Sequence, residues 1–177
     1  MRAKKSMVWN RIHTMCELQK VDEDLMYQRA KRVLGIYRDV CWAAVNRTEH
    51  IPDEMFDYCS RDLESALVYL EEFAPDKEKE QFEDRVRTLF ETRWMLNMID
   101  SAMLMIKEYP KYGDIYFEIL SKCYLTRFAY SESEILELMD IERSRFYNRK
   151  KEAVMLFGCL FWGTALPKVK YYLNEYK

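Results

Sequence analysis

The chain has 177 residues, of which 49% are hydrophobic, and 28 Lys and Arg against 30 Asp and Glu give a formal net charge of −2. A chain of this length can bury a core without disulfides or metal ions. Only four glycines and four prolines are present. That is too few for the many turns of a β-rich fold, so the composition favours long helices joined by few loops.

The apolar stretches are too short to predict a signal peptide or a membrane span. The N-terminal sequence MRAKKSMVW lacks the continuous apolar region of a signal peptide. The longest apolar block, residues 153–166, is shorter than a bilayer requires and contains two glycines. We therefore expect a cytoplasmic protein with no membrane partner.

The residue types that carry metal, redox and catalytic chemistry are scattered. The cysteines form no CxxC pair and lie among apolar neighbours: Cys16, Cys41, Cys59, Cys123 and Cys159. This pattern predicts reduced, buried thiols rather than a disulfide framework or a zinc site. The two histidines, His13 and His50, are far apart, and no Gly-rich phosphate loop, HExxH motif or nucleophile elbow occurs. We expect no cofactor, no metal and no enzymatic activity.

The first half of the chain has the apolar periodicity of long helices. Residues 21–48 predict one amphipathic helix, and Pro52 with the two acids after it predicts the start of a second. Pro75 ends the second helix, and a third is expected to run to about residue 108. Short connections make consecutive helices antiparallel neighbours, so we expect a helical hairpin or a three-helix bundle up to about residue 108. This antiparallel helical bundle would form a domain over residues 1–109.

Acidic side chains are concentrated in this predicted bundle. Between residues 49 and 91 acids greatly outnumber bases, whereas bases gather at the N-terminus and between Arg143 and Lys151. The local field at a contacting face matters more for nucleic-acid binding than the net charge does. We expect the bundle to provide homodimerisation or a contact to RNA polymerase or another protein.

Residues 109–113 (YPKYG) predict the boundary between this bundle and a second domain over residues 112–177. A short helix is expected over residues 115–125. It should be followed by two helices joined by a tight turn within residues 131–154, which read SESEILELMDIERSRFYNRKKEAV. The spacing of this last stretch is typical of a helix-turn-helix.

Local signals define the two helices of this motif. Ser131 or Ser133 is predicted to cap the first helix, and Glu134 stands at the capping-box distance from Ser131. Asp140 is expected in the turn, in a left-handed conformation that aspartate tolerates better than most residues do. The predicted buried positions are Ile135, Leu138, Met139, Ile141, Phe146 and Ala153.

The second helix of the motif is the candidate for reading DNA. Its predicted outward side carries Arg143, Ser144, Tyr147, Asn148 and Lys151. Arginine and asparagine can make bidentate contacts to guanine and adenine, while tyrosine and lysine suit phosphates. Arg145, Arg149 and Lys150 are expected at the flanks, where contact with the DNA backbone is favoured.

This arrangement resembles region 4 of the sigma-70 family and the related phage and mobile-element regulators of Firmicutes type. The resemblance covers residues 112–163, with the segment EILELMDIERSRFYNRKKEAV at its centre. It implies base-reading roles for Arg143, Ser144 and Asn148, and supporting or phosphate-binding roles for Arg145, Tyr147 and Lys151. No segment resembles the polymerase-binding or promoter-melting region of a full sigma factor, so a complete sigma factor is not predicted.

Two features have alternative interpretations. The apolar residues 154–166 are expected to pack back onto the N-terminal bundle; a dimer or polymerase contact is the other interpretation. Bases near the N-terminus (Arg2, Lys4, Lys5 and Arg11) are expected to form a frayed, solubilising end rather than a DNA-binding arm.

The sequence thus predicts an all-α protein in which a helical bundle precedes a helix-turn-helix that binds double-stranded DNA and regulates transcription. The basic helix over residues 142–152 would insert into the major groove. The alternative is a helical protein–protein adaptor without nucleic-acid binding, in which the basic helix is an ordinary solvated face.

Overall fold

The computed structural model describes residues 6–48, 67–72 and 93–175, and the side chains of residues 39–48, 93, 94 and 173 are outside this description. The fold is all-α, and the described residues contain no strand. The elements are α1 (Met7–Leu18), α2 (Glu23–Thr48), α5 (Arg93–Lys107), α6 (Gly113–Leu120), the π-helical turn η1 (Ser121–Leu125), α7 (Glu132–Met139), α8 (Arg143–Leu160), the π-helical turn η2 (Phe161–Ala165) and α9 (Leu166–Glu175). Residues 67–72 are also helical.

The predicted helix over residues 21–48 is confirmed as α2, and the one over residues 115–125 is confirmed as α6 with η1. The third predicted helix is seen in its described part as α5. The predicted helix start at Pro52, and most of the acidic segment between residues 49 and 91, lie outside the described residues.

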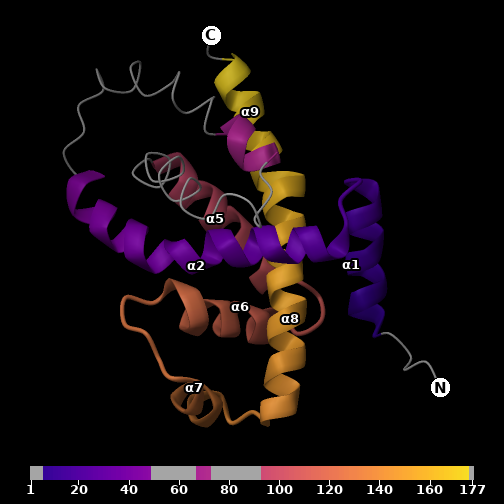
Figure 1. The fold of residues 1–177 in the computed structure, drawn as a ribbon, viewed down its shortest axis with the longest axis vertical. Helices are drawn as coiled ribbons and strands as arrows, with labels where there is room; N and C mark the ends of the chain where they lie inside the picture. Colours follow the sequence, from indigo (N-terminus) through magenta and orange to yellow (C-terminus); the bar gives the residue numbers. More distant parts are fainter. Residues whose placement is uncertain (1–5, 49–66, 73–92, 176–177) are drawn as a thin grey trace.

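The molecule is built around one long helical rod formed by α8, η2 and α9 (Figure 1). The π-helical turn η2 lies directly before Pro167, the second residue of α9. Proline has no N–H to donate, and in an α-helix its ring would clash with the carbonyl group four residues earlier. That carbonyl belongs to Gly163, which lies inside η2, where the wider turn relieves the crowding. The rod therefore continues through a proline that would otherwise end it.

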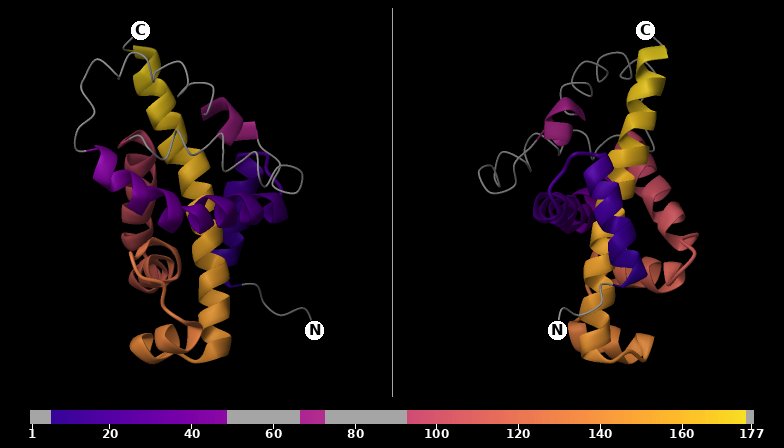
Figure 2. Two further views of the ribbon diagram at one scale, coloured as in Figure 1. Left: turned by 60° about the vertical axis from the view of Figure 1, so that its left-hand side comes forward. Right: turned by 90° about the vertical axis from the view of Figure 1, so that its right-hand side faces the viewer.

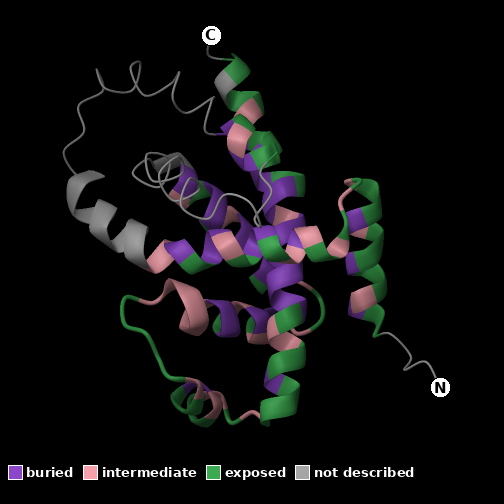
Figure 3. Ribbon diagram, in the orientation of Figure 1, coloured by how far each residue is buried: buried purple, intermediate pink, exposed green. Residues whose placement is uncertain are grey.

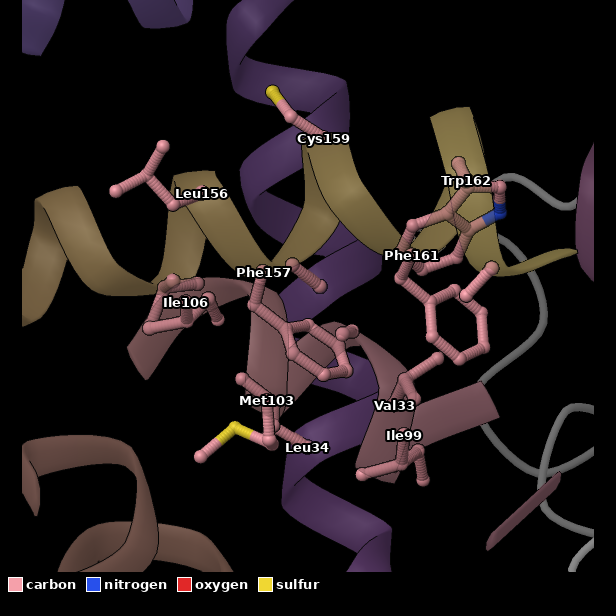
Figure 4. Packing of buried hydrophobic residues seen from close by; sticks show 14 of the residues in the cluster. Val33, Leu34, Ile99, Met103, Ile106, Leu156, Phe157, Cys159, Phe161 and Trp162 are labelled. Carbon is pink, nitrogen blue, oxygen red and sulfur yellow. The ribbon is translucent and has the colours of Figure 1, made fainter. Parts of the chain in front are cut away.

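The middle of the rod is the centre of the hydrophobic core. In Figure 4, Phe157 and Phe161 lie between side chains of α2 and α5, among them Leu34 and Met103, and all four side chains are at most 3% exposed. The same cluster includes Ile12 from α1 and residues of α6 and α9. Each large side chain buried in this way contributes about 1.5–3 kcal/mol.

The two predicted domains share this core. Residues from α1, α2 and α5, within the predicted domain 1–109, pack in one cluster with residues from α6, α8 and α9, within the predicted domain 112–177. Figures 1 and 2 show α2 crossing the rod, with α5 beside it. The boundary near residue 110 is thus a tight turn within one packed unit rather than a linker.

In that turn the backbone at the start of α6 packs directly against the end of α5. Tyr112 has φ 63° in the left-handed region, and α6 begins at the next residue. A Cβ atom at Gly113 would lie 2.6 Å from the carbonyl oxygen of Lys107 and 2.7 Å from that of Ile106. Only glycine allows α6 to start this close to the end of α5.

The apolar residues 154–166 pack inside the molecule, as expected in the first of the two interpretations. From Val154 to Cys159 every residue is buried (Figure 3), and Trp162 Nε1 donates to the Leu70 carbonyl oxygen at 3.0 Å. Arg143–Tyr172 is the one helical stretch among the described residues that is long and apolar enough to cross a bilayer, but 72% of its most apolar window is buried within the protein. Such burial is usual for the central helix of a core.

The predicted state of the cysteines is confirmed for two of them. Cys16 and Cys159 are free, buried thiols whose sulfur atoms lie 3.7 Å apart. Cys123 is free and half-buried. The side chains of Cys41 and Cys59 lie outside the described residues.

Candidate nucleic-acid interface

The N-terminus of α7 has the capping box that the sequence predicts. Ser131 is the N-cap: its Oγ accepts from the Glu134 N–H at 3.3 Å, and its own N–H donates to Glu134 Oε2 at 2.6 Å. The hydrogen bond from the Ser131 N–H, followed by that with its hydroxyl, lowers the pKa of Glu134. The choice between Ser131 and Ser133 is thereby decided in favour of Ser131.

The turn between α7 and α8 is a Schellman motif. Asp140 has φ 46° and ψ 51°, the left-handed conformation expected for it. Its N–H donates to the Glu137 carbonyl at 3.2 Å, and the Ile141 N–H donates to the Leu136 carbonyl at 3.2 Å. These two bonds satisfy carbonyl groups that the end of α7 would otherwise leave unpaired. Only three residues therefore separate the end of α7 from the start of α8.

A small second core holds the two helices against α6. It consists of the buried residues Ile119, Ile135 and Phe146, one each from α6, α7 and α8. Ile141 and Met139 pack against this core and are half-buried. Leu138, predicted to be buried, is 58% exposed instead because α7 turns its other side toward α6 and α8. The three helices form a unit at one end of the rod (Figures 1 and 2).

The first turns of α8 present a polar face to solvent (Figure 3). The residues on it are exposed: Arg143, Ser144, Arg145, Tyr147, Asn148 and Lys151. Since Ser144, Asn148 and Lys151 are spaced by four and three positions, they follow one line along the helix. The remainder of α8 is buried, so only its N-terminal half is available to a large partner.

One carboxylate of α7 lies beside this face. Glu132 Oε1 is 3.3 Å from Arg143 Nε, and Tyr147 donates its hydroxyl hydrogen to Glu132 Oε2 at 2.5 Å. This hydrogen bond raises the pKa of Tyr147. Arg143 remains largely exposed, with 69% of its side chain accessible.

Arg149, predicted as a flanking DNA contact, is engaged inside the protein. Its side chain is 18% exposed, and Nη1 donates to Glu152 Oε2 at 2.6 Å. Its guanidinium carbon lies 3.7 Å from the centroid of the Tyr112 ring, a cation–π contact. Burial opposes the charge of Arg149, but the hydrogen bond and charge of Glu152 outweigh it, and the pKa of Arg149 is raised. We therefore exclude Arg149 from the candidate interface.

Glu152 is the centre of this internal network. It is 2% exposed and also accepts from the Tyr116 hydroxyl at 2.7 Å and from Ser6 Oγ at 3.2 Å. Burial, then the hydrogen bond and charge of Glu152, raise the pKa of Tyr116. The network ties α8 to α6 and to the N-cap of α1. No sequence pattern predicted this network; the one local signal is that Glu152 directly precedes the apolar block.

The two lysines of the predicted DNA-binding helix lie near aromatic rings. Lys150 is half-buried, and its Nζ is 5.5 Å from the Tyr124 ring centroid. Lys151 is exposed, and its Nζ is 5.5 Å from the Trp9 ring centroid in α1. Such contacts direct a lysine stem without removing its charge from solvent.

An arginine from α2 fixes the segment that precedes α7. Arg38 Nε donates to the Thr126 carbonyl at 2.8 Å, and Nη2 donates to the carbonyls of Lys122 and Cys123 at 3.4 and 3.3 Å. These carbonyls end η1, where helical partners are missing. Arg38 thereby connects the core to the chain that leads into α7, a role that the sequence did not reveal.

Comparison with protein-family models, with curated proteins and with solved structures found no match to the chain. The resemblance of residues 112–163 to sigma-70 region 4 therefore depends on the motif residues and stays a prediction. Within the described part of the chain, His, Cys, Asp and Glu side chains form no group of three that could hold a metal ion.

Proposed function

We propose that this protein binds double-stranded DNA through the exposed N-terminal half of α8 and regulates transcription. The observation that carries the proposal is the α6–α7–α8 unit. Its small core of Ile119, Ile135 and Phe146 fixes α8 at the end of the rod and leaves one polar, cationic face of the helix uncovered. A helix presented in this way fits the width of the DNA major groove.

The exposed face of α8 has side chains suited to reading bases and side chains suited to binding phosphates. Arg143 and Asn148 have the donor and acceptor geometry for guanine and adenine edges. Arg145 and Lys151 lie at exposed positions from which a cationic side chain can reach phosphates. Lys150 is half-buried at the flank and is assigned a secondary contact with the DNA backbone.

Binding to a pool of random duplexes at several salt concentrations tests the proposal. Each phosphate contact should contribute a slope of about −0.9 to the dependence of log affinity on log salt. Lys151→Ala should weaken binding to all sequences and reduce the slope by about one. Lys168→Ala is the matched control, because Lys168 is an exposed lysine on α9, at the other end of the rod. Equal effects of both variants would contradict the assigned face.

Base reading is tested separately, by changing Arg143 and Asn148 together to Ala. Each good bidentate contact discriminates against the wrong base by about 1–3 kcal/mol, so the double variant should lose sequence preference while retaining salt-dependent binding. The readout is sequencing of duplexes enriched by the parent and by the variant. An unchanged preference would show that these two residues do not read bases.

The adaptor hypothesis predicts a different outcome of the first experiment. A protein that only binds other proteins through its helices should show no retention on duplex DNA even at low salt. Dimerisation and a contact to RNA polymerase also stay predictions. Sedimentation of the full chain with and without DNA tests whether the protein is a dimer.

A further inference from the structure

We propose that Glu132 is a specificity-determining residue: it positions Arg143 and Tyr147 so that the arginine meets a base edge in one orientation. This inference rests on the proposed DNA-binding function and assigns a role in it to an acidic residue that would not itself contact DNA. The observation behind it is a single carboxylate in contact with two neighbouring residues of the exposed α8 face.

The contact is made through Nε of Arg143, at the inner end of the guanidinium group. Glu132 Oε1 lies 3.3 Å from Nε of Arg143. This contact does not involve the two terminal nitrogens of the guanidinium group. Those terminal nitrogens can form a planar, bidentate contact to guanine O6 and N7. The ion pair therefore restrains the side chain without occupying its base-reading edge.

The carboxylate itself is held on a rigid element. Glu132 is the first residue of α7, directly after the N-cap Ser131, and Ile135 anchors this helix in the small core. The second oxygen of Glu132 accepts from Tyr147, one turn along α8 from Arg143. A side chain fixed at both oxygens can direct an arginine, whereas a single exposed pair contributes only about 0–1 kcal/mol to stability.

A competing role makes an opposite prediction. If Glu132 only blocked the face by imitating a phosphate, its removal would strengthen binding to every duplex alike. If it positions Arg143, its removal lowers the preference at one base position, because a freely rotating arginine contacts several bases and phosphates equally well. The discriminating quantity is therefore the preference between bases, not the overall affinity.

The experiment compares four full-length proteins in enrichment from a random duplex pool at fixed salt: the parent, Glu132→Ala, Glu132→Gln and Glu137→Ala. Glu137 is exposed on the same helix and carries the same charge, so Glu137→Ala controls for the lost negative charge. Far-UV circular dichroism confirms that each variant is folded. Arg143→Ala identifies the base position that this arginine reads.

At that position, a parent preference of about 5- to 150-fold corresponds to one good base contact. Glu132→Ala should reduce it about tenfold or to the level of Arg143→Ala. Glu132→Gln, which retains one acceptor oxygen, should fall between the parent and Glu132→Ala, and Glu137→Ala should keep the parent's preference.

Failure of the positioning role and failure of the proposed DNA binding give different results. If the parent enriches a sequence and Glu132→Ala enriches the same one equally well, the positioning role is overturned while DNA binding stands. If Glu137→Ala loses the preference as strongly as Glu132→Ala does, general charge is responsible, and the positioning role is again overturned. If the parent binds no duplex at low salt, the proposed function fails and this inference fails with it.

Discussion

At the scale of single residues, local hydrogen bonds shape the turn between α7 and α8. Ser131 and Glu134 pair their side chains with each other's backbone, and Asp140 adopts φ 46° so that two amide groups reach back to the end of α7. Each of these interactions joins residues at most five positions apart. Because such bonds depend on residues close together in the chain, sequence spacing predicted the capping box and the left-handed conformation of Asp140.

The capping serine can be tested against its neighbour. Ser131→Ala should lower the free energy of unfolding by about 1 kcal/mol, because the Glu134 N–H loses its acceptor. Ser133→Ala, two positions along on the exposed surface, is the matched control and should change it by only a few tenths. Urea denaturation followed by circular dichroism measures both. Equal losses in the two variants would contradict the assignment of the N-cap.

The capping box also predicts a pH dependence. Hydrogen bonds from Ser131 hold the pKa of Glu134 below its usual value of 4.5. A carboxylate with a lowered pKa in the folded state stabilises the protein fully above that usual value and less as pH falls through the folded pKa. The difference in stability between the parent and Glu134→Gln should therefore be constant near neutral pH and shrink below about pH 4.5. A difference that grows toward acid pH would contradict this mechanism.

At the scale of elements, the buried carboxylate of Glu152 connects helices far apart in the chain. It accepts hydrogen bonds from Ser6 at the N-cap of α1, from Tyr116 in α6 and from Arg149 one turn earlier in α8. Removing one member of a buried charge pair is more damaging than never having the pair, because the other charge stays desolvated. The packing of α1 and α6 against α8 therefore depends on this single side chain.

Replacement of Glu152 tests that sensitivity. Glu152→Ala should lower the free energy of unfolding by about 3–5 kcal/mol, because Arg149 and the Tyr116 hydroxyl lose their acceptor. Glu152→Gln retains one acceptor oxygen and should cost less. The double change Arg149→Met with Glu152→Leu should recover much of the loss, since it removes both charges together. Urea denaturation gives all three values, and a double variant no more stable than Glu152→Ala would contradict the explanation.

At the scale of the whole molecule, one core unites helices from both ends of the chain. Phe157 and Phe161 are completely buried between Leu34 of α2 and Met103 of α5. The candidate DNA-binding unit projects from this core as an end of the same rod. The helix α8 therefore belongs both to the core and to the exposed unit.

The shared core predicts that residues 112–177 do not fold alone. Without α2 and α5, the apolar side chains of residues 154–166 would face water, an exposed patch larger than most monomers tolerate. The isolated segment should show no cooperative thermal unfolding, whereas the full chain should unfold in a single transition. A cooperative transition in the isolated segment at the melting temperature of the full chain would restore the two-domain interpretation.

The sequence predicted several of the described helices, but it did not predict α1 (Met7–Leu18). The helices over residues 21–48 and 115–125, the capping box and the conformation of Asp140 follow from neighbours along the chain. The engagement of Arg149 could not be predicted in the same way. Its partner Glu152 is buried only because residues as distant as Ser6, 146 positions away, pack around it.

What the sequence determined by itself is therefore the all-α class, the tight turn at Asp140 and a basic helix after it. These features depend on backbone hydrogen bonds and on side chains a few positions apart. Only the tertiary structure decided that Arg145 is exposed while Arg149 is half-buried, although both are arginines one turn apart on the same helix. The physical reason is that burial depends on which distant helices pack against each side of α8, and no local pattern encodes that choice.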